Sequence, residues 1–198
     1  CPGIFRKTTP GIYRQMSNKI SVIGAGTMGS GIAQVAASNS CQVTIVDSFP
    51  QVLESSQAKL KSILNRLVEK GKMNEDKTQH ILANINWTSE MEEIVDSDLV
   101  IEAIVENLEI KQKLFSQMES LVSEDCILAT NTSSLSVAGI ASACNNQTRI
   151  MGIHFFNPVP LMKLVEVIPT EKTDERLVKE VKSILEGWGK TVVTAKDT

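Results

Sequence analysis

Apolar residues along the chain recur with two spacings, one typical of buried strands and the other typical of helices. Short apolar runs, the first of them β-branched, predict strands at residues 19–23, 42–46, 99–104, 127–129, 150–154, 164–168 and 191–195. Apolar residues three or four positions apart, or runs of small residues, predict helices at residues 27–38, 51–70, 74–84, 108–122, 137–144 and 175–188. Strands that alternate with helices are typical of a doubly wound, mostly parallel sheet, so we expect an α/β fold.

Two consecutive predicted helices between residues 51 and 84 depart from this alternation. Together they are too long for a single crossover between strands, and Gly71 separates them. We therefore expect a helical hairpin that projects from the sheet.

The composition excludes several classes of function. Hydrophobic residues make up 42% of the 198 residues and charged residues 22%, which is ordinary for a soluble globular protein. The net charge of −3 and the lack of a basic stripe predict no nucleic-acid partner. No apolar run approaches the roughly 20 residues that cross a bilayer, so we expect no membrane segment.

The four cysteines show neither a C-x-x-C pair nor clustering with the two histidines. This spacing predicts no metal site, and it favours buried thiols in a reducing compartment. These cysteines are Cys1, Cys41, Cys126 and Cys144.

The segment KISVIGAGTMGSGIAQ has the pattern G-x-G-x-x-G directly after a predicted strand and at the start of a predicted helix. Gly24 permits a tight turn, Gly26 lets a pyrophosphate approach the backbone, and Gly29 lets helix and strand pack closely. Free N–H groups at the helix N-terminus favour the anion. Thr27 and Met28, between the last two glycines, complete the predicted cofactor-binding segment.

Asp47 ends the second predicted strand, 18 residues after Gly29. In dinucleotide-binding folds an acid at about this distance accepts hydrogen bonds from the adenosine ribose. A carboxylate there also repels the 2′-phosphate of NADP, so the pattern predicts a Rossmann-type domain that binds NAD. The alternative is that Asp47 is only a solvated acid at a strand end.

The first fifteen residues differ in composition from the rest of the chain. They contain three basic residues, no acidic residue and two Pro-Gly pairs, and Met16 follows them. We expect residues 1–15 to be a leader, either added for expression or left from a mitochondrial transit peptide. We expect residues 16–198 to be the NAD-binding domain.

Candidate chemistry lies in the second half, in NTSSLS at residues 131–136 and HFFNPVPLMKLVEV at residues 154–167. A histidine at a strand end is more often structural than catalytic. His154, however, opens a polar and aromatic loop that returns into a strand carrying Glu166. A carboxylate between valines needs a partner, because an unpaired buried charge is costly. The loop is a suitable length to bring the two strand ends together.

The segments GAGTMGSGIAQ, EAIVENLEIK, NTSSLS and HFFNPVPLMKLVEVI together resemble the L-3-hydroxyacyl-CoA dehydrogenase family, from about residue 19 onward. The resemblance implies that an acyl-CoA is the substrate and that its 3-hydroxyl is oxidised to a ketone with NAD. It implies that His154 is the general base, that Glu166 orients it, and that Ser133 hydrogen-bonds the substrate oxygen.

The resemblance also implies contacts with the bound molecules. It implies that Glu106 and Asn157 lie near the nicotinamide end of NAD, and that Ser133 lies beside them. It also implies that Lys111 contacts the cofactor. Lys70, on the helical hairpin, is placed at the CoA phosphates; a plain solvated lysine is the alternative reading.

Family members continue into a second, mostly helical domain that closes the cleft and forms a dimer. We expect that domain, with the family's catalytic asparagine, to be absent here, so that the chain alone binds NAD but turns over poorly. The resemblance implies a homodimer for the full-length protein, in the cytoplasm or the mitochondrial matrix. Two other readings stay open: a Rossmann dehydrogenase for a hydroxy acid or sugar nucleotide, and a non-catalytic NAD-binding protein.

Overall fold

The structure, a computed structural model, describes residues 5–9, 12–15 and 18–197. Within these ranges the main sheet has eight strands in the order β10-β9-β8-β7-β6-β3-β4-β5. The strand bounds are Lys19–Ile23 (β3), Gln42–Val46 (β4), Ile85–Thr88 (β5), Leu99–Glu102 (β6), Ile127–Thr130 (β7), Ile150–Phe155 (β8), Leu164–Pro169 (β9) and Thr191–Thr194 (β10). All neighbouring strands are parallel except β8 and β9, which are antiparallel. The predicted doubly wound, mostly parallel α/β sheet is therefore confirmed.

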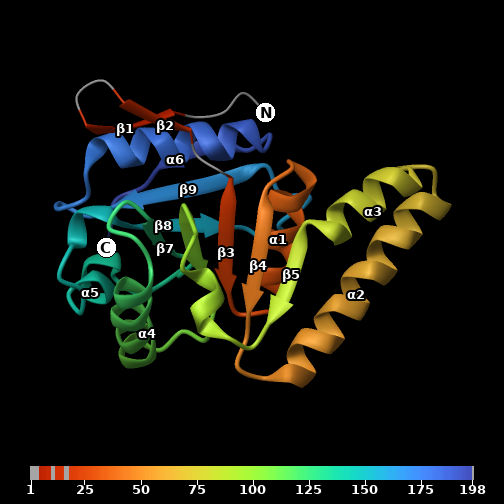
Figure 1. Ribbon diagram of the computed structural model, residues 1–198, viewed down its shortest axis with the longest axis horizontal. Coiled ribbons are helices and arrows are strands. Elements are labelled where there is room, and N and C mark those ends of the chain that lie inside the picture. Colours follow the sequence, from red (N-terminus) through yellow and green to blue (C-terminus); the bar gives the residue numbers. More distant parts are fainter. Residues whose placement is uncertain (1–4, 10–11, 16–17, 198) are drawn as a thin grey trace.

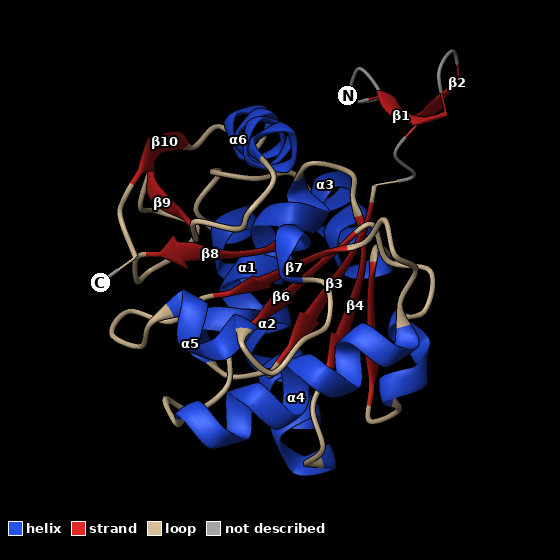
Figure 2. Cartoon of the chain, turned by 90° about the vertical axis from the view of Figure 1, so that its left-hand side faces the viewer, coloured by secondary structure: helices blue, strands red, loops and turns tan. Residues whose placement is uncertain are grey.

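Helices cover both faces of this sheet (Figure 2). Their bounds are Thr27–Ser38 (α1), Pro50–Glu69 (α2), Glu75–Ala83 (α3), Leu108–Leu121 (α4), Val137–Ala141 (α5) and Glu175–Gly187 (α6). Residues of α1, α2, α3 and α6 pack into one apolar cluster with one face of the strands, and residues of α4 and α5 pack into a second cluster with the other face. The central strands β6 and β7 are buried throughout, as expected for parallel strands covered on both sides.

The helical hairpin is confirmed, and Figure 1 shows α2 and α3 extending beyond the edge of the sheet. Only three residues of the 20-residue helix α2 are buried. The hairpin turns at Gly71, whose φ of 67° is a conformation that glycine adopts without strain. Asn74 then begins α3, because its side chain accepts a hydrogen bond from the Lys77 N–H.

The edge strand β5 was not predicted. Its sequence, INWT, has no continuous apolar run because Asn86 interrupts it, and it acquires strand structure by pairing with β4. The predicted helix at residues 137–144 is shorter, since α5 ends at Ala141. Short 3-10 turns at Met91–Ile94 and Gln147–Arg149 were also missed.

The first fifteen residues include two antiparallel strands, Phe5–Thr9 (β1) and Ile12–Gln15 (β2), which form a sheet separate from the main one. The sequence prediction assigned no structure there. Met16, where we placed the domain boundary, lies outside the described residues, so that boundary stays a prediction. Among the described residues, none of the helices combines the length and the apolar character needed to span a membrane.

Candidate functional site

The glycine loop joins β3 to α1 at the carboxyl edge of the sheet. Gly24 has a φ of 102°, and a Cβ on it would lie 2.7 Å from the Ala103 carbonyl oxygen. A Cβ on Gly29 would lie 1.8 Å from the Gly24 carbonyl oxygen. The folded chain therefore requires both glycines. Gly26 differs, because a Cβ there would meet no described atom within 4 Å.

That open space lies at the N-terminus of α1, where an anion is favoured. Gly26 is the N-cap and supplies no side-chain cap hydrogen bond among the described residues. The first N–H groups of a helix have no partner within the helix, so a bound phosphate can accept from them. Thr27 and Met28 begin the helix beside it. The cradle fits a dinucleotide pyrophosphate.

Asp47 follows β4 and contacts the glycine loop. Its Oδ2 accepts the Ala25 N–H at 2.8 Å, and its Oδ1 accepts the Phe49 N–H at 3.0 Å. The hydroxyls of Ser30 and Ser56 donate to the Ala25 carbonyl oxygen at 2.9 and 2.6 Å. Asp47 therefore shapes the loop, and each carboxylate oxygen still has a lone pair to accept a ribose hydroxyl.

His154 and Glu166 face each other across the only antiparallel pairing of the described main sheet. They are directly opposite in the β8–β9 register, and His154 Nδ1 lies 2.8 Å from Glu166 Oε2. Their side chains are 18% and 30% exposed, and the ring of Phe156 lies with its centroid 4.6 Å from that of His154. A carboxylate on Nδ1 favours the tautomer that carries a proton there, which leaves Nε2 free to accept one. The structure thus brings these two side chains together, and their catalytic roles stay a prediction.

A second network lies at the end of β6. Lys111 and Glu102 are 1% and 0% exposed, with 2.5 Å between Nζ and Oε1. Lys111 Nζ also lies 3.2 Å from Glu106 Oε2. Glu102 accepts a further hydrogen bond from the Thr130 hydroxyl at 2.7 Å. The predicted cofactor contact Lys111 is thus an internally paired lysine, and its contact with NAD stays a prediction.

Glu106 connects this network to the NTSSLS segment. Its carboxylate accepts the Ser133 N–H at 2.9 Å and the Thr132 hydroxyl at 2.9 Å. Burial alone would raise the pKa of Glu106, but these hydrogen bonds and the Lys111 ammonium outweigh burial and lower its pKa. Glu106 is therefore held as a carboxylate, and it fixes the backbone that presents the exposed Ser133.

The ends of β7 and β8 are tied together by Asn131, whose Oδ1 accepts the Phe155 N–H at 2.8 Å. This bond brings the Ser133 loop to the strand end that carries His154. The sequence prediction missed Asn131 and Glu102 as individual residues. An acid inside the apolar run LVIEAI is the same signal that singled out Glu166, so Glu102 was within reach of that reasoning.

A cavity of about 330 Å³ lies between α1, α2 and the loop after β8. Gly26, Thr27 and Asn157 line it, so the structure brings Asn157 beside the glycine loop. Lys70 does not line it. Lys70 is exposed and follows the lining residue Leu67 by three residues, at the C-cap of α2. Its contact with CoA phosphates stays a prediction.

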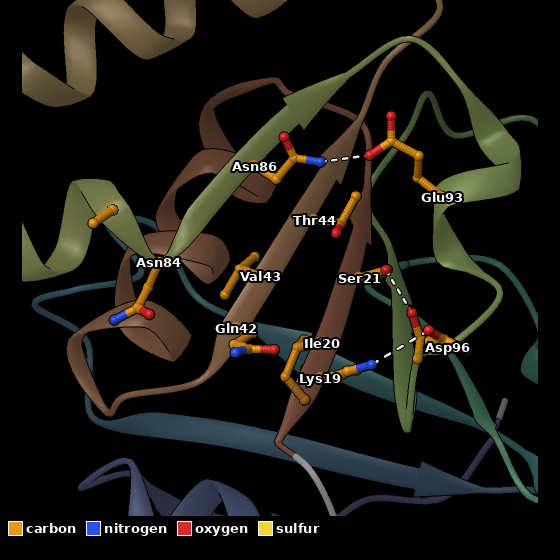
Figure 3. Close-up of a pocket in the computed structure, with 12 residues that line it drawn as sticks. Lys19, Ile20, Ser21, Gln42, Val43, Thr44, Asn84, Asn86, Glu93 and Asp96 are labelled. Atoms are coloured by element: carbon orange, nitrogen blue, oxygen red, sulfur yellow. Dashed lines mark hydrogen bonds and ion pairs between the residues drawn. The ribbon is translucent and has the colours of Figure 1, made fainter.

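A second cavity, of about 340 Å³, lies at the opposite edge of the sheet, at the amino ends of β3, β4 and β5. Figure 3 shows Asn86 directed at Glu93 and Lys19 directed at Asp96 along its walls. None of the predicted site residues lines it. In open α/β sheets ligands bind outside the carboxyl ends of the strands, so the first cavity is the candidate site.

Among the described residues, no group of three or more histidine, cysteine or acidic side chains is placed to hold a metal. Three of the four cysteines are buried: Cys41, Cys126 and Cys144. Cys1 lies outside the described residues.

Comparison with known proteins shows the family of this chain. Residues 19–198 match the family model described as "3-hydroxyacyl-CoA dehydrogenase, NAD binding domain". A probable 3-hydroxybutyryl-CoA dehydrogenase of Deinococcus radiodurans is 41% identical over 179 residues, which cover 90% of this chain and 64% of that protein. The mitochondrial hydroxyacyl-coenzyme A dehydrogenase of Sus scrofa is 40% identical over 185 residues, covering 90% and 59%.

The fold is shared with solved structures of the same kind. A crystal structure of 3-hydroxybutyryl-CoA dehydrogenase from Escherichia coli K12 superposes with a TM-score of 0.89 at 38% identity, covering 91% of this chain and 38% of that one. The chain thus spans about three fifths of the length of the curated relatives that it matches. This chain therefore belongs to the NAD-binding domain family of the 3-hydroxyacyl-CoA dehydrogenases, and its cofactor is NAD.

Proposed function

We propose that this chain forms the NAD-binding part of an enzyme that oxidises an L-3-hydroxyacyl-CoA to the 3-oxoacyl-CoA. The observation that carries the proposal is the His154–Glu166 pair, with Nδ1 and Oε2 2.8 Å apart, at the carboxyl edge that also holds the glycine loop. The competing dehydrogenases for hydroxy acids or sugar nucleotides typically rely on a lysine or cysteine of a second domain. Their chemistry does not require a histidine–carboxylate pair at this edge of the sheet.

NAD, when bound, supplies the hydride acceptor for this reaction. The side chains have to remove the hydroxyl proton, and His154 Nε2 accepts it as the general base. Glu166, at Nδ1, fixes the ring and stabilises the imidazolium that forms, as in other histidine–carboxylate pairs. Ser133 holds the substrate oxygen, and it is placed by the Glu106 carboxylate on its backbone N–H.

The binding roles follow from the same edge of the sheet. Gly24, Gly26 and Gly29, with Thr27 and Met28, receive the pyrophosphate, and Asp47 accepts the ribose hydroxyls. Glu106 and Asn157 lie toward the nicotinamide end, with Lys111 behind Glu106. We assign the acyl-CoA to the cavity beside Asn157 and its phosphates to Lys70.

For the whole protein we propose a homodimer, located in the cytoplasm or the mitochondrial matrix. The mitochondrial name of the Sus scrofa relative supports the second location. Neither a nucleic acid nor a membrane is part of the proposal.

The test is reduction of acetoacetyl-CoA with NADH by the longest form of the protein that its gene encodes. Loss of NADH absorbance is expected, and His154→Gln should slow it by at least about 10²-fold, within the range for a positioned general base. A series of acyl-CoA substrates of increasing length then defines the preferred chain. NADH binding without turnover on any of them would refute the enzyme and favour a non-catalytic NAD-binding protein.

A further inference from the structure

Lys190 is a buried lysine that forms no ion pair with a described carboxylate. It is 8% exposed, and its Nζ donates to the carbonyl oxygens of Val159 at 2.6 Å and Met162 at 2.8 Å. Burial lowers its pKa, because an ammonium removed from water loses solvation. Two backbone carbonyls thus take the place that water or an acid usually occupies.

The backbone around Lys190 is fixed on both sides. The chain turns at Gly189, whose φ is 76°, and the Lys190 N–H donates to the Leu185 carbonyl at the end of α6. The next N–H, of Thr191, donates to the Lys163 carbonyl at 2.8 Å and begins the pairing of β10 with β9. The Lys190 side chain therefore extends to the loop from backbone that is held by hydrogen bonds on both sides.

The segment that Lys190 holds is the loop of residues 156–163, which joins the strand of His154 to the strand of Glu166. Val159, 2% exposed, packs against α1, where a Cβ on Gly31 would lie 2.9 Å from the Val159 Cβ. Val159 and Asn157 both line the 330 Å³ cavity. The loop therefore packs against α1 on one side and accepts hydrogen bonds from the Lys190 ammonium on the other.

We propose that Lys190 is a positioning residue, which holds the Val159 and Met162 carbonyls and so fixes Asn157 and the cavity wall relative to His154. Its catalytic consequence rests on the dehydrogenase function proposed above. An apolar side chain of similar length would fill the same space, but it would leave two loop carbonyls without their donor. The loop would then lose its fixed geometry while the sheet stays intact.

The test compares Lys190→Met with Lys179→Met, which removes an exposed lysine from α6, the helix that precedes Lys190. In the longest form of the protein, hydrogen exchange of the peptide over residues 156–163 should quicken by at least about tenfold in Lys190→Met only. Peptides over β3 and β6 should keep the exchange of the unmodified protein. Lys190→Arg, which keeps the charge and its donors, should restore part of the protection.

Kinetics give the second readout. With acetoacetyl-CoA, Lys190→Met should lower kcat/KM by at least about tenfold, because a displaced loop costs substrate orientation, whereas Lys179→Met should leave kcat/KM unchanged. Unchanged loop exchange, or an equal rise in all peptides, would overturn the proposal. If Lys190→Met yields no folded protein, Lys190→Arg and Lys190→Gln are judged by the same two readouts. An unmodified protein without turnover refutes the dehydrogenase, whereas loop exchange still decides the role of Lys190.

Discussion

Gly26 and Gly29 belong to the same motif, but the structure assigns them different reasons for being glycine. A Cβ on Gly26 meets no described atom within 4 Å, whereas a Cβ on Gly29 lies 1.8 Å from the Gly24 carbonyl oxygen. We predict that Gly26→Ala loses cofactor affinity without losing stability. Gly29→Ala, the matched variant, should lose stability.

The magnitudes follow from these contacts. At the N-cap position of α1, alanine is less favourable than glycine by about 0.5–1 kcal/mol. Alanine also lowers the conformational entropy of the unfolded chain, which stabilises the fold by about 0.4–1 kcal/mol. The two effects nearly cancel, so the free energy of unfolding of Gly26→Ala should stay within about 0.5 kcal/mol of the unmodified chain. Its methyl group would occupy the approach of the pyrophosphate, and NADH affinity should fall at least tenfold, or about 1.4 kcal/mol.

Gly29→Ala cannot be accommodated without moving the backbone of the glycine loop. Overpacking of this kind costs about 1–3 kcal/mol, and a contact of 1.8 Å with a carbonyl oxygen argues for the upper end. For a chain of this size about 3 kcal/mol lowers the melting temperature by roughly 6–12 °C.

The assays are NADH fluorescence titration and thermal unfolding without cofactor, on both variants and the unmodified chain. Gly26→Ala should differ from the unmodified chain in NADH affinity but not in melting temperature. If Gly26→Ala binds NADH as tightly as the unmodified chain at the same melting temperature, the pyrophosphate does not lie on this loop. If Gly29→Ala melts like the unmodified chain, the close packing of α1 on β3 is wrong.

Three further predictions concern individual side chains. NAD should bind at least tenfold tighter than NADP, because the 2′-phosphate of NADP beside the Asp47 carboxylate is a like-charge contact that costs more than about 1.4 kcal/mol. Equal affinities by calorimetry would show that the Asp47 carboxylate does not face the ribose. Glu166→Gln should slow turnover less than His154→Gln but clearly, because the amide allows the wrong imidazole tautomer; unchanged turnover would remove Glu166 from the mechanism. Burial raises the pKa of the Cys41 and Cys144 thiols to about 11, so peptide-resolved alkylation near pH 8 should be far slower than that of a free thiol, and equal rates would contradict it.

The order of strands and helices was predictable because the central elements bury both faces. β3 and β4 and helix α1 have the bounds that the apolar pattern predicted. The edge strand β5 was not predictable in the same way, because its strand structure comes from pairing with β4 and not from the local sequence INWT. Local pattern therefore predicted the centre of the sheet and the edge strand β10, but it missed the edge strand β5.

The site was predictable as a set of residues but not as a set of contacts. The glycine motif indicated which backbone receives an anion, yet no pattern indicated that Asp47 also accepts the Ala25 and Phe49 N–H groups. Lys190 carried no signal, because its partners are backbone carbonyls of residues 31 and 28 positions away, and carbonyls are the same in every sequence.

Glu102 and Glu166 show where sequence reasoning ends. Each is an acid inside an apolar run, and for each the cost of burial predicts a partner. The partner of Glu102 is Lys111, from the helix that follows its own strand, so the pair closes within nine residues and becomes a buried support. The partner of Glu166 is His154, from a neighbouring strand that runs the opposite way, and both side chains stay partly exposed. Because β8 and β9 are antiparallel, the short loop of residues 156–163 is enough to bring His154 and Glu166 opposite each other near the end of β8.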